Sequence, residues 1–253
     1  MAVIDPSDLY LISYTSGTTG QPKGAMVTHK AIVCTAMLER LDPLLTGPPV
    51  YLSYLPMAHV YERIMLIFVV VRQGQIGMFN GDVTKLTEDL ALLKPTFFAS
   101  VPRLYNKFYQ KINAKFADGS FVARALVNKA VSTKLSNLKE DGSYKHWVYD
   151  KLVFSKVKMI LGGNVQCMIS GSAPIAEDVV DFFKICMGVP LLEGYGQTEG
   201  QGLEFAQDPR DWTSGNVGGI TTSMELKLID VPEMSYSVLD KDENGNPAPR
   251  GEV

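Results

Sequence analysis

Short apolar runs alternate along most of the chain with longer segments of helical periodicity. Runs rich in branched and aromatic residues predict strands over 9–14, 50–55, 75–79, 96–101, 165–170 and 189–193. Amphipathic segments between them predict helices over 28–41, 61–72, 83–93, 103–116, 121–138, 147–161 and 176–187. This alternation predicts an α/β fold with mostly parallel sheets flanked by helices.

The hydrophobic pattern changes near residue 220. Residues 224–229 alternate between apolar and polar positions, and the β-prone residues 236–239 precede a turn-rich stretch at 244–247. We therefore expect a partial α/β core over residues 1–220 and the start of a smaller β-rich subdomain over residues 221–253. The last five residues have the pattern of another strand's beginning, so we expect this chain to be the centre of a longer protein.

The most informative motif follows the first predicted strand, whose apolar residues 9–12 indicate a buried strand. Residues 14–24 read Tyr-Thr-Ser-Gly-Thr-Thr-Gly-Gln-Pro-Lys-Gly. Glycines let a tight turn bring backbone N–H groups close to a phosphate, and hydroxyls and a lysine add further donors. Pro22 before Lys23 and Gly24 after it disfavour a Walker A loop. A flexible linker is the alternative, but linkers seldom follow a buried strand.

Two other polar, glycine-containing motifs also follow predicted strands. The first is Ser-Gly-Ser-Ala-Pro at 170–174, and the second is Glu-Gly-Tyr-Gly-Gln-Thr-Glu at 193–199. In open parallel sheets, ligands bind beyond the carboxyl ends of the strands. We therefore expect the three motifs to line one cleft.

Together these motifs resemble those of the adenylate-forming superfamily, which includes acyl-CoA synthetases, luciferases and the adenylation domains of peptide synthetases. The motifs occur in that family's order, and the resemblance covers essentially the whole chain. Two further stretches, LPMAHVYER at 55–63 and DWTSGNVG at 211–218, are similar to eukaryotic long-chain fatty acyl-CoA synthetases. The resemblance implies the fold of the large N-terminal domain of these enzymes. It also implies that a ribose-binding aspartate and a small domain with an essential lysine lie outside this sequence.

The resemblance implies ATP-dependent activation of a long-chain fatty acid to acyl-CoA. The fatty acid carboxylate attacks the α-phosphorus of ATP, pyrophosphate leaves, and the thiol of coenzyme A then displaces AMP from the acyl-adenylate. Because the nucleophile belongs to the substrate, the protein has to position two anions and neutralise developing charge. Mg²⁺ is the expected ion, since it bridges phosphates through oxygen ligands.

The resemblance also assigns roles to individual residues. The expected catalytic residues are Lys23, His59, Thr198 and Glu199. The expected Mg²⁺ ligands are Glu199 and Thr15. The expected nucleotide-binding residues are Thr15, Ser16, Gly17, Thr18, Thr19, Gly20, Lys23, Gly171, Ser172, Ala173, Pro174, Glu193, Gly194, Tyr195, Gly196, Gln197 and Thr198. The expected substrate-binding residues are His59, Val217 and Gly218.

Three of these assignments have a simpler structural alternative. Glu199 has the alternative of a surface glutamate or a helix cap, and Tyr195 that of core packing in place of stacking on adenine. His59 has the alternatives of a residue at a helix N-terminus or a hydrogen-bonding core residue. Glu62 and Arg63 are expected to form local helix pairs, and no catalytic role is assigned to them.

Composition indicates which partners the protein can bind and in which cellular compartment it works. A net charge of −3 argues against a nucleic-acid surface. The three cysteines, including Cys167 in an apolar strand, have neither disulfide-framework nor zinc-site spacing, which is typical of a reducing, intracellular location. The apolar run 64–71 is far shorter than the about 20 residues of a membrane-spanning helix. A cytoplasmic enzyme is expected, with peripheral attachment of the full-length form to the cytosolic face of the endoplasmic reticulum or another membrane left open.

Two other functions remain open from the sequence. One is adenylation of a different carboxylic acid, such as an aryl or short-chain acid. The other is a nucleotide-binding module without turnover. We expect the fragment alone to be inactive, because the resemblance places a catalytic lysine and the ribose-binding aspartate outside it.

Overall fold

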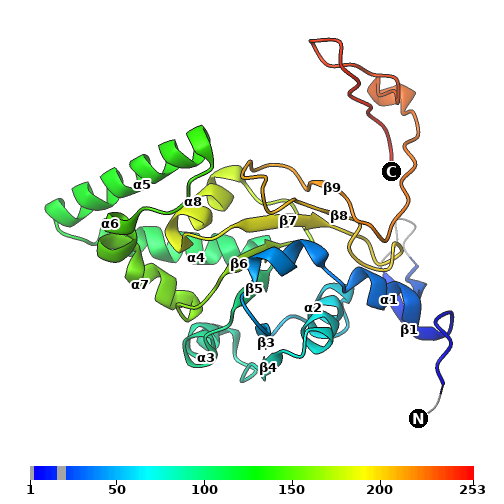
Figure 1. Ribbon diagram of the computed structural model, residues 1–253, viewed down its shortest axis with the longest axis horizontal. Coiled ribbons are helices and arrows are strands. Elements are labelled where there is room, and N and C mark those ends of the chain that lie inside the picture. The colour runs from blue at the N-terminus through cyan, green and yellow to red at the C-terminus, as the bar shows by residue number, and fades with distance from the viewer. Residues whose placement is uncertain (1–2, 16–20) are drawn as a thin grey trace. The chain divides into compact units, whose positions relative to one another are not determined.

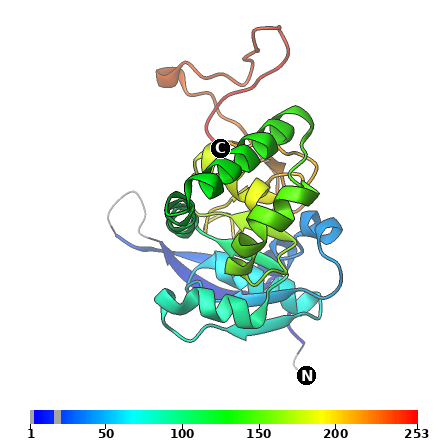
Figure 2. The same ribbon diagram turned by 90° about the vertical axis from the view of Figure 1, so that its left-hand side faces the viewer.

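A computed structural model describes residues 3–15 and 21–253 (Figures 1 and 2). Its helices are α1 (His29–Thr35), α2 (Val60–Val71), α3 (Leu86–Leu93), α4 (Pro102–Ala117), α5 (Phe121–Asp141), α6 (Trp147–Tyr149), α7 (Ser155–Lys158) and α8 (Glu177–Met187). Its strands are β1 (Leu9–Thr15), β2 (Lys23–Thr28), β3 (Val50–Ser53), β4 (Gln75–Met78), β5 (Phe97–Ser100), β6 (Cys167–Ser170), β7 (Leu191–Tyr195), β8 (Phe205–Ala206) and β9 (Gly219–Ile220). Short 3-10 turns cover Glu39–Leu44, Val83–Lys85, Met159–Leu161 and Pro232–Met234, and a π-helical turn covers Asp150–Phe154.

The strands of the described residues form three sheets, and the predicted α/β class is confirmed. The largest sheet has the order β5-β6-β7-β8-β9, and two-stranded sheets join β1 to β2 and β3 to β4. Strands β5, β6 and β7 are parallel, as are β3 and β4, whereas β1–β2 and β7–β8 pair antiparallel. The sheets are therefore mixed, with a parallel centre.

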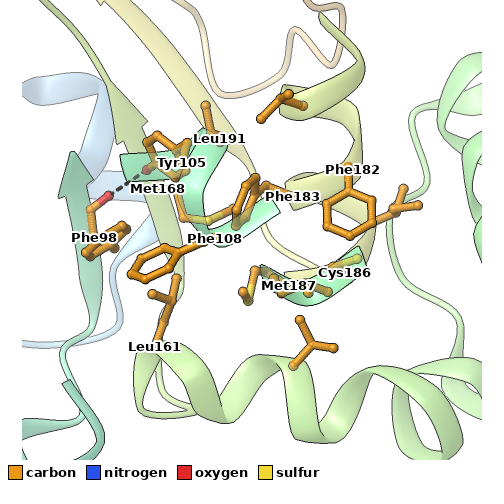
Figure 3. Packing of buried hydrophobic residues seen from close by; sticks show 14 of the residues in the cluster. Phe98, Tyr105, Phe108, Leu161, Met168, Phe182, Phe183, Cys186, Met187 and Leu191 are labelled. Carbon is orange, nitrogen blue, oxygen red and sulfur yellow. Dashed lines mark hydrogen bonds between the residues drawn. The ribbon is translucent and has the colours of Figure 1, made fainter. Parts of the chain in front are cut away.

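Alternation along the central strands divides the core into two halves. Phe98, Met168 and Leu191 belong to one buried cluster, which includes residues of α4, α5 and α8 (Figure 3). The neighbouring positions Phe97 and Cys167 belong to a second cluster with α2. Successive side chains of a strand point to opposite faces, so each strand supplies both clusters. Figure 1 accordingly shows α4, α5 and α8 on one side of β5–β7 and α2 on the other.

The register of the parallel strands aligns the residues at their carboxyl ends. Ser100 on β5 pairs with Ser170 on β6, and Ser170 pairs with Glu193 on β7. Segments that leave these three strands therefore begin at one edge of the sheet. Two of the sequence motifs, at 170–174 and 193–199, start in this row.

Several local predictions are confirmed by hydrogen bonds. Thr28 caps α1 by accepting from the backbone N–H of Ala31 at 3.2 Å, and Ser120 caps α5 by accepting from that of Ala123 at 3.3 Å. The prediction that Cys167 lies in the core is also confirmed, because the residue is fully buried and this burial raises the pKa of its thiol to about 12.

Two predicted helices differ from the structure. Helix α1 ends at Thr35, earlier than predicted, and residues 147–161 form short α, π and 3-10 segments in place of one helix.

The prediction for the first strand is wrong in two respects. Strand β1 is not fully buried, because Leu9 and Ile12 are each about half exposed. It also does not join the parallel sheet, since it pairs antiparallel with β2, a strand that the sequence analysis missed. Tyr10 and Leu11 both pack against the second cluster, and the register shift between Leu9 and Leu11 interrupts the alternation of β1 at this point.

The chain divides into two compact units, residues 1–219 and 220–253. The second unit carries three isolated antiparallel bridges, which join Ile229 to Glu252, Val231 to Tyr236 and Lys241 to Pro247. Asp242 closes its turn by accepting from the backbone N–H groups of Asn244 at 2.9 Å and Asn246 at 2.8 Å. The β-like pattern of this region thus corresponds to paired bridges and turns.

Candidate active site

The first and third motifs meet through one side-chain hydrogen bond. The hydroxyl of Thr15, at the end of β1, donates to Oε1 of Glu199 at 2.8 Å. These are the two residues expected to share a metal ion. Residues 16–20 of the first motif lie outside the described residues, and the described part resumes at Gln21. Lys23 begins β2, is exposed, and pairs across the hairpin with Thr15.

The third motif folds into a tight turn after β7. The backbone N–H of Gly202 donates to the carbonyl of Gln197 at 3.1 Å, and that of Glu204 donates to the carbonyl of Tyr195 at 2.9 Å. Gly196 is required by this closure, because a Cβ on it would stand 1.8 Å from the carbonyl oxygen of Gly202. The turn presents Thr198 and Glu199 at its tip.

This turn is anchored to the elements that follow the first motif. Oε1 of Gln201 accepts from the backbone N–H of Thr28 at 3.1 Å. Gly202 packs so closely that an added Cβ would lie 2.7 Å from Ile64 on α2 and 3.0 Å from Thr35 on α1. Gln201 was missed in the sequence analysis, where a glutamine beside the motif gave no chemical signal. It and Gly202 fix the third motif next to the β1–β2 hairpin.

The second motif lies beside the third at the sheet edge. The backbone N–H of Gly171 donates to the carbonyl of Ser100 at 3.3 Å, which extends the β5–β6 ladder. A Cβ on Gly171 would lie 3.6 Å from the carbonyl oxygen of Gly194 and from the ring of Tyr61. Ser172 takes a left-handed conformation with φ of 74°, and Ala173 and Pro174 after it are exposed. The backbone of this motif therefore borders the start of the 193–199 motif.

Tyr195 is 40% exposed, so its ring is not part of the buried core. The side-chain amide of Gln197 donates to its hydroxyl at 2.6 Å, and the ring of Phe205 meets it edge-on with centroids 5.9 Å apart. These contacts hold the partly exposed ring against Gln197 and Phe205. A partly exposed aromatic ring offers a face on which a planar base can stack.

Glu193 faces the interior although it stands in the nucleotide motif. It is 7% exposed, and its Oε1 accepts from the backbone N–H of Gly215 at 3.3 Å. Its own backbone N–H donates to Oε1 of the fully buried Gln207 at 2.9 Å. Burial raises the pKa of the Glu193 carboxyl. Glu193 thus ties the 211–218 stretch to β7.

The predicted acyl-side residues lie in a glycine turn before β9. The backbone N–H of Gly218 donates to Oδ1 of Asn216 at 2.9 Å. Gly218 has φ of 74°, and an added Cβ would lie 2.2 Å from the carbonyl oxygen of Ala206. Val217 between them is 36% exposed. The turn is therefore fixed by close backbone packing, with Val217 available for contact.

His59 is the N-cap of α2 and is exposed. Its Nδ1 accepts from the backbone N–H of Tyr61 at 3.2 Å, which matches the helix N-terminal alternative. This cap directs Nδ1 to the backbone, and a role of the ring toward substrate stays a prediction. The cap begins the helix that packs behind the third motif.

The expected local helix pairing of Glu62 and Arg63 is wrong. Glu62 is fully buried and accepts from the hydroxyls of Tyr51 at 2.6 Å and Ser53 at 2.5 Å, both on β3. Burial is the main cause that raises its pKa. Nη1 of Arg63 lies 3.5 Å from the hydroxyl of Tyr10. Both residues tie α2 to strands, which their spacing on the helix could not indicate.

The described part of the site fits a magnesium–nucleotide complex. A hydroxyl and a carboxylate in contact are hard oxygen donors, and Mg²⁺ is commonly held by one or two carboxylates with phosphates and water as its other ligands. Among the described residues no cluster of three or more histidine, cysteine or acidic side chains could hold a metal alone. The donor set therefore suits an ion that arrives with phosphates.

The fold and this arrangement agree with what comparison with known proteins finds. The sequence profile of the AMP-binding enzyme family matches residues 1–252, and the chain belongs to that family. It is similar to long chain acyl-CoA synthetase 7, peroxisomal, of Arabidopsis thaliana, with 42% identity over 98% of this chain and 35% of that protein. It is also 42% identical to long-chain-fatty-acid–CoA ligase 5 of Mus musculus, over 91% of this chain and 34% of that protein.

Solved structures show the same fold. The adenylation domain of a carboxylate reductase from Mycobacterium chelonae superposes with a TM-score of 0.69 at 28% identity, over 98% of this chain and 33% of that one. A carboxylic acid reductase didomain from Segniliparus rugosus in complex with AMP gives 0.67 at 28% identity, over 98% of this chain and 30% of that one. The chain therefore spans about a third of the length of the proteins that it matches.

Proposed function

We propose that the chain forms the nucleotide- and acid-binding part of a long-chain fatty acid–CoA ligase that forms AMP. The observation that carries the proposal is the contact of Thr15 with Glu199, which joins two motifs from distant parts of the sequence. The names of relatives that are 42% identical support the substrate class. Adenylation of another acid is the second candidate, favoured by the fold shared with carboxylic acid reductases.

In this proposal the described residues bind and orient the two anionic reactants. Thr15 and Glu199 would hold Mg²⁺, which when bound would neutralise phosphate charge. Lys23 would hold the β- and γ-phosphates together with residues 18–20, which lie outside the described residues, and Thr198 would contact the α-phosphate. The 170–174 and 193–197 motifs hold the adenine, mainly through backbone groups and the ring of Tyr195.

The acid lies on the other side of the α-phosphate. His59 approaches the carboxylate, and Val217 and Gly218 border the acyl chain. Attack of the carboxylate forms the acyl-adenylate and releases pyrophosphate, and the thiol of coenzyme A then displaces AMP. The rate gain comes from holding the carboxylate and the α-phosphorus in line.

The test is ATP–pyrophosphate exchange and thioester formation by the full-length protein with a panel of carboxylic acids. Palmitate is expected to exceed aryl and short-chain acids, and the opposite ranking would favour the second candidate. Exchange absent with every acid would point to a nucleotide-binding module. Residues 1–253 alone are expected to make little or no acyl-CoA, because the chain spans only about a third of its relatives.

The location of the enzyme belongs to the same proposal. Within the described residues, no helix combines the length and the apolar character that crossing a membrane requires. From the cysteine pattern we expect an intracellular enzyme. Its substrate in this proposal is a long-chain fatty acid, and peripheral membrane attachment of the full-length protein is left open. Fractionation of cells that express the full-length protein, with a high-salt wash of the membranes, tests this expectation.

A further inference from the structure

A buried lysine on α8 forms hydrogen bonds to residues 212–214, the segment that precedes the acyl-side turn at 215–218. Lys184 is 1% exposed, and Nζ donates to the carbonyl oxygens of Trp212 and Thr213, both at 3.0 Å, and to the hydroxyl of Ser214 at 3.1 Å. An ammonium group has three N–H donors, and here each has a partner. Burial lowers the pKa of Lys184, against the opposing effect of the Asp181, Glu193 and Asp211 carboxylates.

Two further hydrogen bonds hold residues 212–214 in place, one to α8 and one from the sheet side. The hydroxyl of Ser214 donates to Oδ1 of Asp181, one helical turn before Lys184, at 2.7 Å. From the sheet side, the side-chain amide of Gln207 donates to the carbonyl of Thr213 at 3.1 Å. The carbonyl of Thr213 therefore accepts from both α8 and the strand side. The segment 212–214 is clamped between them.

The clamp sets the start of the acyl-side turn. Gly215 directly follows it and donates its backbone N–H to Glu193 at 3.3 Å. Gly215 has φ of 83°, and an added Cβ would lie 2.4 Å from Glu177 of α8. The turn then continues through Val217 to β9. A shift of residues 212–214 would therefore move the turn that follows.

We propose that Lys184 is a positioning residue that sets the acyl-side turn, residues 215–218, and thereby the binding of the fatty acid. The inference rests on the proposed function, because that function makes this turn a wall of the acyl site. Lys184 acts through the backbone of 212–214 and contacts neither reactant. The ammonium is suited to this task because its three N–H donors can bond two neighbouring carbonyls and a hydroxyl at once.

The chain offers a matched control in a second buried lysine. Lys134 of α5 has no exposed side-chain surface, and its Nζ contacts Asp150 and the carbonyl of Ile185. Its Nζ also lies 4.8 Å from the ring centroid of Phe154, in the buried cluster that includes α8, and its hydrogen-bond partners are outside the 212–218 segment. Replacing either lysine by methionine removes a buried ammonium, so both variants are expected to lose stability.

The experiment compares Lys184→Met, Lys134→Met and Ser214→Ala in the full-length protein. We expect Lys184→Met to raise KM for palmitate about tenfold and to alter the chain-length profile, with KM for ATP unchanged. Ser214→Ala removes one link, keeps the helix core intact, and is expected to raise KM for palmitate about threefold. Lys134→Met is expected to lower Tm without changing either KM.

Hydrogen exchange of residues 212–218 supplies a readout that does not depend on activity. Exchange there is expected to be faster in Lys184→Met and Ser214→Ala than in Lys134→Met. Equal exchange in all three, or equal rises of KM for ATP and palmitate, would overturn the positioning role. A parent protein without fatty acid activation would contradict the proposed function instead, and the exchange pattern would still decide whether Lys184 holds the turn.

Discussion

Thr15 and Glu199 lie 184 positions apart in the sequence, yet the hydroxyl of one donates to the carboxylate of the other at 2.8 Å. Thr15 ends β1 of the hairpin, and Glu199 stands at the tip of the turn after β7. Two residues after Glu199, the side chain of Gln201 accepts from the backbone N–H of Thr28 and links the same turn to β2. A carboxylate beside phosphates would repel them unless a cation lay between, which gives this pair its role in the proposed chemistry.

Replacing Glu199 by glutamine in the full-length protein is expected to slow adenylation by on the order of 10²-fold and to weaken its Mg²⁺ dependence. The amide can still accept from Thr15 but no longer carries charge. The measurement is ATP–pyrophosphate exchange at several Mg²⁺ concentrations. Glu204→Gln is the control, because Glu204 accepts from the backbone N–H of Gln197 at 3.3 Å, as an amide oxygen also can. An equal loss in both variants would contradict a metal role for Glu199.

Lys23→Ala is expected to weaken the binding of ATP and pyrophosphate while leaving the affinity for the fatty acid unchanged. The reason is the position of Lys23 at the end of the phosphate motif, where a mobile ammonium can reach the terminal phosphates. The measurement is the KM for ATP and for palmitate in the full-length protein. Lys30→Ala removes another exposed lysine nearby on α1 and is expected to change neither. A parallel fall in fatty acid affinity would argue against the assignment.

Gly196→Ala is expected to disrupt the turn that carries Glu199. The added Cβ would stand 1.8 Å from the carbonyl oxygen of Gly202, so the turn has to open. Overpacking of this kind destabilises by about 1–3 kcal/mol or more, and adenylation should fall with it. Gly219→Ala is the matched control, since its nearest neighbour would be Arg40 Nη2 at 3.9 Å. The measurements are Tm and ATP–pyrophosphate exchange for both variants. Values for Gly196→Ala equal to those of the parent protein would show that the turn tolerates a side chain.

Glu62 is expected to make stability depend on pH in a defined direction. Burial raises its pKa above the ordinary 4.5, so the folded state keeps a proton that the unfolded state releases. The free energy of unfolding therefore falls as pH rises from the ordinary pKa through the folded-state pKa, and Glu62→Gln should flatten this fall. Thermal unfolding of the full-length protein from pH about 4.5 to about 7 measures it.

The control for this experiment is Glu88→Gln, which removes an exposed glutamate in the first turn of α3. Its pH profile is expected to follow that of the parent. The prediction for Glu62 fails if the stability of Glu62→Gln falls with rising pH as steeply as that of the parent protein over the measured pH range. The hydroxyls of Tyr51 and Ser53 can rotate to suit an amide, so this variant is expected to fold.

The sequence by itself determined most of the elements around the parallel centre and the residue types of the motifs. Apolar runs and caps such as Thr28 are local signals, because a few neighbouring residues decide whether a turn of helix or a strand forms. The motif at 193–199 likewise announced its chemistry through residue types within one turn. The order and type of elements around the parallel centre could therefore be predicted, whereas the roles assigned to the acidic and hydroxyl groups of the motifs stay predictions.

Only the tertiary structure decided which distant groups meet. Three contacts join segments whose sequences do not indicate that they meet. They are the pairing of β1 with β2, the burial of Glu62 against β3 and the hydrogen bonds of Lys184 to residues 212–214. A buried charge is stable only where partners surround it, and those partners are chosen by packing between elements. The sequence therefore determined which chemical groups each motif carries, and the packing of α1, α2 and α8 determined where the described parts of the motifs stand.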